Sequence, residues 1–219
     1  MTAEPRQPGE QLRAGEPTRP RIAATVLLLR GGEETLEVLL VQRNPAARFM
    51  GGAWVFPGGA VDPHEGEGDR AHRRAAVREV REETGVRLPD PAELVLVSRW
   101  ITPPEYRIRF DTYFFLAGMP EDQAVTIDRR ECVDHGWFAP ARALERFQAG
   151  QLKLVLPTIR HLELLAASVS AADALRSNTG RDIRPVEPRI VGTGEQALVT
   201  IPGESGRPPT RLADRPPGS

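Results

Sequence analysis

A cluster of glutamates constrains this chain more than any other feature of its sequence. Glu79, Glu82 and Glu83 stand at positions i, i+3 and i+4, which share one face of an α-helix. Like charges at this spacing repel each other, so a protein keeps them either on a solvated face or around a divalent cation. The sequence alone leaves both interpretations open.

The segment around the cluster has the pattern of a helix with a buried stripe. The stripe consists of Ala71, Ala75, Ala76 and Val80. Gly85 follows directly, as is typical of a helix C-terminus, so we predict a helix over Arg70–Thr84. Upstream, the short predicted strand Trp54–Phe56 runs into Pro57-Gly58-Gly59, which we expect to form a tight turn. A glycine turn beside a carboxylate helix suits a phosphate and a metal ion.

Apolar runs predict the remaining elements. The predicted strands are Ile22–Leu29, Leu36–Gln42, Glu93–Thr102, Arg107–Leu116 and His135–Phe138. The first two are predicted to form a hairpin. Helices are predicted at Pro140–Gln148 and Leu156–Ala167, and a last small hairpin at Pro188–Val191 and Ala197–Ile201. Because the helices do not alternate regularly with the strands, we predict an α/β or α+β domain and not a βαβ repeat.

Proline is concentrated at the two ends of the chain. Nine of the 21 prolines lie in the first twenty and the last eighteen of the 219 residues. These ends also lack apolar periodicity, so we predict disordered tails at 1–20 and 203–219. The length fits one domain, predicted at 21–170, followed by an extension at 171–202 that holds a helix and the small hairpin.

Composition excludes several classes of protein. There are 29 basic and 30 acidic residues, a net charge of −1, which argues against a strongly basic nucleic-acid-binding protein. Cys132 is the single cysteine, so neither a disulfide framework nor a cysteine-based zinc site is expected. Apolar runs are too short for a membrane span, and no secretory signal follows Met1. We therefore expect a cytoplasmic protein.

The glutamate segment resembles the signature of the Nudix hydrolase family. That signature reads Gly, five residues, Glu, seven residues, Arg-Glu, an aliphatic residue, any residue, Glu-Glu, any residue, Gly and an aliphatic residue. Its second half is complete in Arg78, Glu79, Val80, Glu82, Glu83, Gly85 and Val86. Gly59 and Glu65 have the spacing of the first half, but Gly66–Val77 holds twelve residues instead of seven. We expect the excess to loop out. Arg70 stands where the family has its glutamate, so the role of Glu65 stays open.

The resemblance implies a fold, a cofactor and a set of residue roles. The fold is an α/β/α sandwich with a mixed sheet, the Nudix helix and C-terminal helices. Glu79, Glu82 and Glu83 are the implied ligands of Mg²⁺ or Mn²⁺, and Arg78 is implied to hold a glutamate in place. Glu131, six residues before Trp137, is the candidate general base; its rivals are Glu79, Asp128 and Asp134.

A second pattern concerns the substrate. Leu39-Leu40, Arg43, Arg48, Gly52 and Phe56-Pro57-Gly58-Gly59 have the spacing of the coenzyme A diphosphatase branch of the family, although Val41 and Asn44 depart from it. Arg109–Thr112 and Leu156-Pro157-Thr158 resemble its peroxisomal members, whereas the C-terminal Pro217-Gly218-Ser219 is not a peroxisomal address. Arg43, Arg48, Gly58 and Gly59 are therefore the implied substrate contacts.

The resulting hypothesis is a hydrolase that cuts coenzyme A or an acyl-coenzyme A into 3′,5′-ADP and a 4′-phosphopantetheine product. Two alternatives stay open. One is an ADP-ribose or dinucleotide pyrophosphatase of the same family, and the other is a non-catalytic regulator that binds a nucleotide on this fold. The expected partner is a small nucleoside diphosphate derivative, with neither nucleic acid nor membrane, and a homodimer is left open.

Overall fold

The computed structural model describes residues 16–47, 49–192, 198–203 and 210–211. Most of the two predicted tails, and the predicted phosphate contact Arg48, lie outside the described residues. Close to the start of the described part, the carbonyl of Thr18 accepts a hydrogen bond from Arg109 at 2.7 Å.

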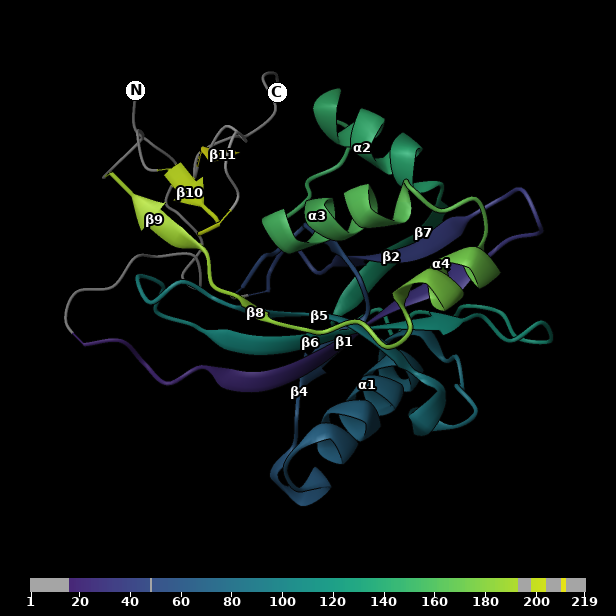
Figure 1. Cartoon of the computed structure of the whole chain (residues 1–219), viewed down its shortest axis with the longest axis horizontal. Coiled ribbons are helices and arrows are strands. Elements are labelled where there is room, and N and C mark those ends of the chain that lie inside the picture. The colour runs from purple at the N-terminus through teal and green to yellow at the C-terminus, as the bar shows by residue number, and fades with distance from the viewer. Residues whose placement is uncertain (1–15, 48, 193–197, 204–209, 212–219) are drawn as a thin grey trace.

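A mixed sheet forms the centre of the described domain (Figure 1). Its strands are β1 (Arg21–Arg30), β2 (Glu37–Arg43), β3 (Trp54–Val55), β4 (Gly58–Ala60), β5 (Val95–Ile101), β6 (Phe110–Gly118), β7 (Cys132–Phe138) and β8 (Pro185–Val186). The main order is β3-β2-β1-β6-β5-β8, while β4 pairs with β1 and β7 pairs with β2. β1 runs parallel to β6 and β5 runs parallel to β8, whereas the other pairs are antiparallel. The predicted hairpin of the first two strands is confirmed.

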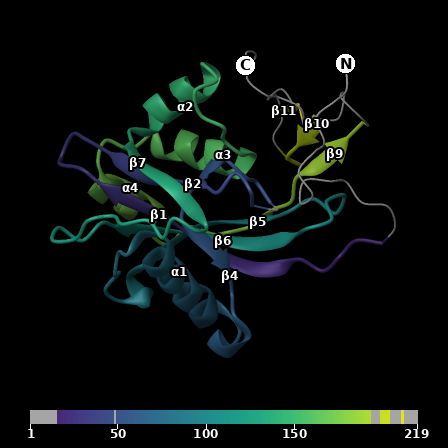
Figure 2. The ribbon, with the colours of Figure 1, turned by 180° about the vertical axis from the view of Figure 1, so that it is seen from behind.

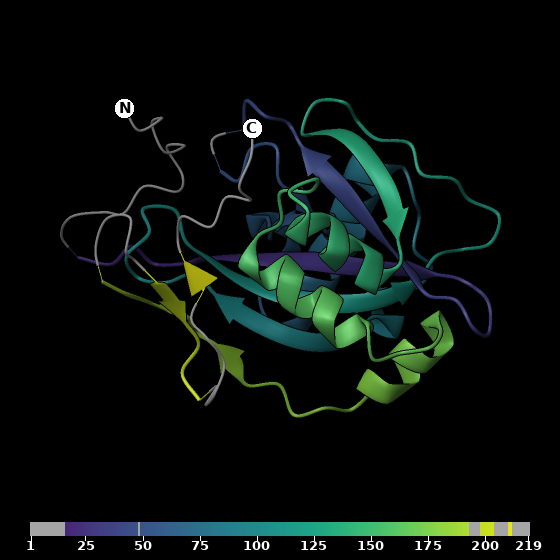
Figure 3. The same ribbon diagram turned by 90° about the horizontal axis from the view of Figure 1, so that it is seen from above.

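Helices cover both faces of this sheet, as Figures 1 and 3 show. They are α1 (Asp69–Thr84), α2 (Pro140–Gln148), α3 (Leu156–Leu165) and α4 (Ala171–Asn178). Strand β1 explains the layering, because Val26 and Leu28 pack in the core on the α1 side, and Leu27 and Leu29 pack in the core under α2–α4. A strand buried on both faces requires a continuous apolar run. The predicted α/β/α sandwich with a mixed sheet is confirmed.

Helix α1 matches its prediction to within one residue. The four predicted stripe residues are buried in the core, and Gly85 ends the helix in a left-handed conformation (φ 71°), with its N–H bonded to the carbonyl of Arg81. Because an L-side chain is unfavourable in that conformation, glycine fixes the end of the helix directly after the glutamates.

Three local predictions were wrong. Gly58 and Gly59 form no tight turn but pair with β1 as strand β4, opposite Thr25 and Ala24. The excess residues between the halves of the signature do not loop out, because α1 starts at Asp69 and absorbs most of them. Strand β6 starts at Phe110, three residues later than predicted, since the N–H of Phe110 bonds to Thr102 across a longer loop.

The C-terminal part adds a strand and a small separate sheet. β8 extends the central sheet beside β5, and β9 (Arg189–Val191) pairs with β10 (Leu198–Thr200) as the predicted small hairpin. β11 (Thr210–Arg211) joins β10 from its other side. Figure 2 shows this small sheet at one side of the molecule, away from α1.

Candidate active site

The glycines of β4 allow helix α1 to approach the sheet closely. A Cβ atom at Gly59 would lie 2.5 Å from the carboxylate carbon of Glu79, which is closer than real Cβ contacts. The N–H of Gly58 donates to Glu83 at 3.0 Å. The glycine strand therefore lies directly against the carboxylates of the helix, and a side chain at Gly59 would displace Glu79.

Arg78 connects the two halves of the signature. Its Nε and Nη2 donate to the two carboxylate oxygens of Glu65 at 3.1 and 3.2 Å, and its Nη1 donates to Glu79 at 2.7 Å and to Glu82 at 2.9 Å. Nη2 also donates to the carbonyl of Ala60 in β4 at 2.9 Å. These charge-assisted bonds fix the arginine and three glutamates relative to β4.

Glu65 belongs to this network despite the longer spacing in the sequence. Its side chain is buried and its second oxygen accepts the N–H of Asp62 at 2.7 Å. Burial raises the pKa of Glu65, but the bonds from Arg78 and from Asp62 outweigh that effect and lower the pKa overall. Glu65 is therefore an ionised partner of Arg78.

The pKa values of Glu79 and Glu83 are raised, in contrast to that of Glu65. Burial raises the pKa of Glu83 to about 8, against the N–H of Gly58, and the nearby charge of Glu79 raises it further. Burial also raises the pKa of Glu79, with Arg78 opposing and Glu82 and Glu131 adding to it. Among the described residues Glu83 has no ion-pair partner, so its ionised form needs a cation.

The donor set fits a hard divalent cation in its chemistry. Carboxylate oxygens are the ligands that Mg²⁺ prefers, and it is commonly completed by substrate phosphates and water. Within the described parts of the chain, no three acidic, histidine or cysteine side chains already converge on one point as a formed metal site. One reason is visible in the geometry: Arg78 takes one oxygen each from Glu79 and Glu82.

The structure places Glu131 beside this cluster, on the loop before β7. It is exposed, and its charge contributes to the raised pKa values of both Glu79 and Glu83. The Asp128 carboxylate accepts the N–H groups of Glu131 at 2.9 Å and Cys132 at 3.0 Å. Asp128, a rival candidate for the general base, is therefore engaged in holding the loop. The other rival, Asp134, is exposed on β7 and accepts the N–H of His135.

Asn44 holds the same loop from the opposite side. Its backbone N–H donates to the carbonyl of Glu131 at 2.8 Å, and its side-chain amide donates to the carbonyl of Arg130 at 2.9 Å. This role of Asn44 was not predicted from the sequence, where the residue stands out only as a departure from the coenzyme A pattern. In the sequence, the signal for this role is an asparagine directly after a predicted strand. In the structure, the side chain of Asn44 accepts the N–H of Ala46.

Arg43 lies at the end of β2, opposite Cys132. Its charge opposes the raised pKa of Glu83, which places it near the carboxylates. Its Nε is buried and has no hydrogen-bond partner among the described residues. The structure therefore brings together Glu79, Glu82, Glu83, Arg78, Gly58, Gly59, Glu131 and Arg43.

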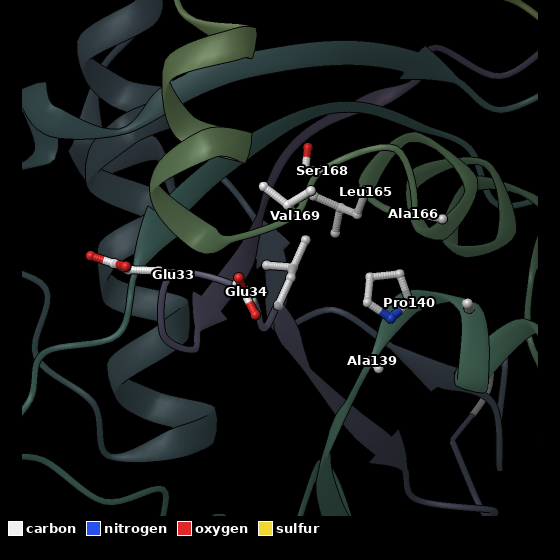
Figure 4. Close-up of a pocket in the computed structure, with 10 residues that line it drawn as sticks. Glu33, Glu34, Ala139, Pro140, Leu165, Ala166, Ser168 and Val169 are labelled. Carbon is white, nitrogen blue, oxygen red and sulfur yellow. The ribbon is translucent and has the colours of Figure 1, made fainter.

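A larger cavity lies elsewhere and does not suit a diphosphate. Its volume is about 750 Å³ and it lies between the β1–β2 hairpin, the start of α2 and the end of α3 (Figure 4). Its two charged lining residues, Glu33 and Glu34, are both acidic, and its other walls are mostly apolar, including Pro140, Leu165 and Val169. An anionic ligand would be repelled there.

The glycine strand, the carboxylate helix and the arginine between them define a Nudix hydrolase. The model of the NUDIX domain matches residues 19–157, and the chain belongs to this family.

The described residues contain no helix that is long and apolar enough to cross a bilayer.

Known proteins of the same family resemble most of the chain. It is 28% identical to nudix hydrolase 7 of Caenorhabditis elegans over 84% of this chain and 73% of that protein. It is 26% identical to the human acyl-coenzyme A diphosphatase NUDT19 over 88% of this chain and 81% of that protein. The crystal structure of a Nudix hydrolase from Alicyclobacillus acidocaldarius, 28% identical, superposes with a TM-score of 0.66 over 75% of this chain and 99% of its own.

Proposed function

We propose that the chain is a metal-dependent hydrolase of nucleoside diphosphate derivatives and that coenzyme A or an acyl-coenzyme A is its substrate. The observation that most supports this is the pair of carboxylates that lies against the backbone of Gly58 and Gly59: Glu83 is buried, and the side chain of Glu79 is only 12% exposed. Two neighbouring carboxylates in a buried place need positive charge nearby. A divalent cation, Mg²⁺ or Mn²⁺, that is shared with an anionic diphosphate supplies it.

The proposed roles follow from the positions of the side chains. Glu79, Glu82 and Glu83 would hold the cation, which, when bound, neutralises phosphate oxygens and acidifies a water molecule. Arg78 keeps the carboxylates of Glu79 and Glu82 in place, and the N–H of Gly58 holds that of Glu83. Because Gly58 and Gly59 have no side chains, the carboxylates of α1 can lie directly against strand β4.

Glu131 is the proposed general base. Its carboxylate accepts a proton from water, the water oxygen bonds to one phosphorus, and the bridging P–O bond breaks with its electron pair on the leaving phosphate. Arg43 and Arg48 supply positive charge to the substrate phosphates.

Two observations favour coenzyme A over other substrates of the family. One is the spacing of Arg43, Arg48 and the glycine strand. The other is the human relative, which is named an acyl-coenzyme A diphosphatase and shares 26% identity over most of this chain. The non-catalytic alternative is disfavoured because Arg78, Glu79, Glu82 and Glu83 are all present.

A substrate panel tests the proposal. Coenzyme A, acetyl-coenzyme A, ADP-ribose and a diadenosine polyphosphate are incubated with Mg²⁺ or Mn²⁺, and the products are identified by mass. We expect 3′,5′-ADP and 4′-phosphopantetheine from coenzyme A, no turnover after chelation, and recovery when the metal is restored. A strong preference for ADP-ribose would overturn the coenzyme A assignment, and binding of nucleotides without hydrolysis would favour a regulator.

A further inference from the structure

A second, smaller pocket adjoins the carboxylate cluster. It has a volume of about 310 Å³ and is lined by Arg43, Asn44, Ala46, Ala47, Arg130 and Glu131. We propose that this pocket is a subsite for a phosphomonoester group of the substrate, with Arg130 as the residue that determines specificity for that group. The inference rests on the proposed function, because it places the additional phosphate of a nucleoside diphosphate derivative.

The charge of the pocket suits a phosphomonoester. Arg43 and Arg130 line it from two different segments, together with Glu131, so its charged lining residues carry a net charge of +1. The Nε of Arg43 is buried without a hydrogen-bond partner among the described residues. The Arg130 side chain is exposed, and its charge helps to lower the pKa of the neighbouring Asp128. Arginine binds phosphate through paired N–H donors, and a phosphomonoester carries close to two negative charges at neutral pH. The two arginines therefore outweigh the single negative charge of Glu131 and offer paired donors to a phosphomonoester.

The loop that carries Arg130 is held firmly. Asp128 caps the N–H groups of Glu131 and Cys132, and the side chain of Asn44 donates to the carbonyl of Arg130 at 2.9 Å. Arg129 has a left-handed backbone conformation (φ 59°), which is uncommon outside glycine and requires support from its surroundings. These contacts fix the backbone of Arg130 before any ligand binds, which reduces the entropy cost of binding.

The position of the pocket favours substrates that carry a further phosphate near their diphosphate. Glu131 borders both the pocket and the carboxylate cluster, so a ligand held at the cluster by its diphosphate can reach the pocket with a neighbouring group. Coenzyme A has such a group, the phosphate on the ribose 3′-oxygen, and ADP-ribose does not. The subsite would therefore explain a preference for coenzyme A within this enzyme class.

The test uses two substrates that differ only in the group concerned. Coenzyme A and dephospho-coenzyme A are compared by kcat/KM in the wild type and in Arg130→Ala. Loss of a charge-assisted contact should lower kcat/KM for coenzyme A roughly ten- to a hundredfold and change that for dephospho-coenzyme A by less than about twofold. The matched control is Arg129→Asn, which removes the same charge one residue away at a backbone conformation that asparagine tolerates. It should leave the substrate ratio unchanged.

A binding measurement separates this inference from the proposed reaction. Titration calorimetry compares 3′,5′-ADP with 5′-AMP, and we expect the wild type to prefer 3′,5′-ADP and Arg130→Ala to lose the preference. If the protein cleaves neither substrate but shows this pattern of binding, the subsite stands and the proposed reaction falls. Equal losses on both substrates, or equal binding of both nucleotides by the wild type, would overturn the subsite even if coenzyme A is hydrolysed.

Discussion

The two faces of the central sheet bury polar groups in opposite ways. On the α1 face the buried acids Glu65 and Asp111 are each paired with an arginine, Arg78 and Arg99, whereas the buried acid Glu83 has no ion-pair partner among the described residues. On the α3 face the core contains the rings of Phe56, Trp100 and Phe114 around one buried histidine, His161. The α1 face therefore pairs two of its buried acids and leaves Glu83 unpaired, whereas the core under α3 keeps its buried histidine neutral.

His161 shows how complete that neutrality is. Its Nδ1 lies 2.6 Å from the carbonyl of Pro157 and its Nε2 lies 2.6 Å from the hydroxyl of Ser98. A carbonyl only accepts, so Nδ1 carries the proton and Nε2 accepts from the serine. Burial lowers the pKa of His161 to about 4, even though the Pro157 carbonyl opposes the shift. The comparison teaches that the α1 face combines paired carboxylates with one unpaired buried carboxylate, Glu83, whereas the core under α3 holds its ionisable ring in the neutral form.

The largest expected effect breaks the charged face at its centre. Glu83→Gln keeps the shape and still accepts the N–H of Gly58, but it removes the charge that would bind a cation. We expect turnover to fall about a hundredfold or more, because the cation supplies several kcal/mol of transition-state stabilisation. Steady-state kinetics with the best substrate of the panel measures this, and circular dichroism checks the fold.

Two further variants keep that test decisive. Glu82→Gln should also lower turnover, and because its side chain is 58% exposed the fold should not suffer. Glu67→Gln removes an exposed carboxylate just before α1 and should change nothing. Unchanged activity in Glu82→Gln and Glu83→Gln would rule out the proposed metal role.

The next effect concerns the arginine that pairs the charges. Arg78→Ala leaves the buried carboxylate of Glu65 without its partner, and breaking a buried pair in this way costs about 3–5 kcal/mol. Arg78→Lys keeps the charge but not the forked geometry, so it should lose less. Urea unfolding of both variants gives the two free energies. Equal stability of Arg78→Ala and wild type would mean that the α1 face does not depend on this pairing.

The contribution of the buried His161 to the free energy of unfolding should depend on pH. Unfolded histidine titrates near pH 6.5, whereas His161 in the fold titrates near 4, so the unfolded chain binds the extra proton between these values. The stability that neutral His161 provides is complete above pH 6.5 and is lost as the pH falls toward 4, by about 3 kcal/mol in total.

The measurement is a difference of two pH series. Unfolding free energies of the wild type and of His161→Gln are compared between pH 7 and pH 4, so that contributions from carboxylates shared by both proteins cancel. The wild type should lose more stability than the variant over this range. Parallel curves would show that His161 is not held neutral by the fold.

Much of this architecture could be predicted from the sequence, for physical reasons that are local. The helix α1 follows from a 3.6-residue apolar period ended by Gly85, and β1 follows from a continuous apolar run. The glutamates then fall on one helix face by spacing alone. The family signature also identified Arg78 as the residue that holds a glutamate, although the excess of five residues had left Glu65 open.

What the sequence could not provide depends on contacts between distant segments. Gly58 and Gly59 look like a turn until β1, over thirty residues earlier, pairs with them. The bond from Asn44 to Arg130 joins residues 86 apart, and no local pattern marks it. The same is true of the pocket between them, which exists only because two loops meet at the end of β2.

The smallest expected effect sharpens the comparison by separating stability from catalysis. Ser98→Ala removes the hydroxyl that donates to His161 Nε2 and leaves a buried acceptor without a partner, at a cost of about 1–3 kcal/mol. Because Ser98 and His161 lie on the face opposite the glutamates, kcat and KM should stay within about twofold of the wild type while the unfolding midpoint falls. A loss of turnover comparable to that of Glu82→Gln would show that the two faces are coupled, and that the packing of α3 against Phe56, just before the glycine strand, takes part in shaping the active site.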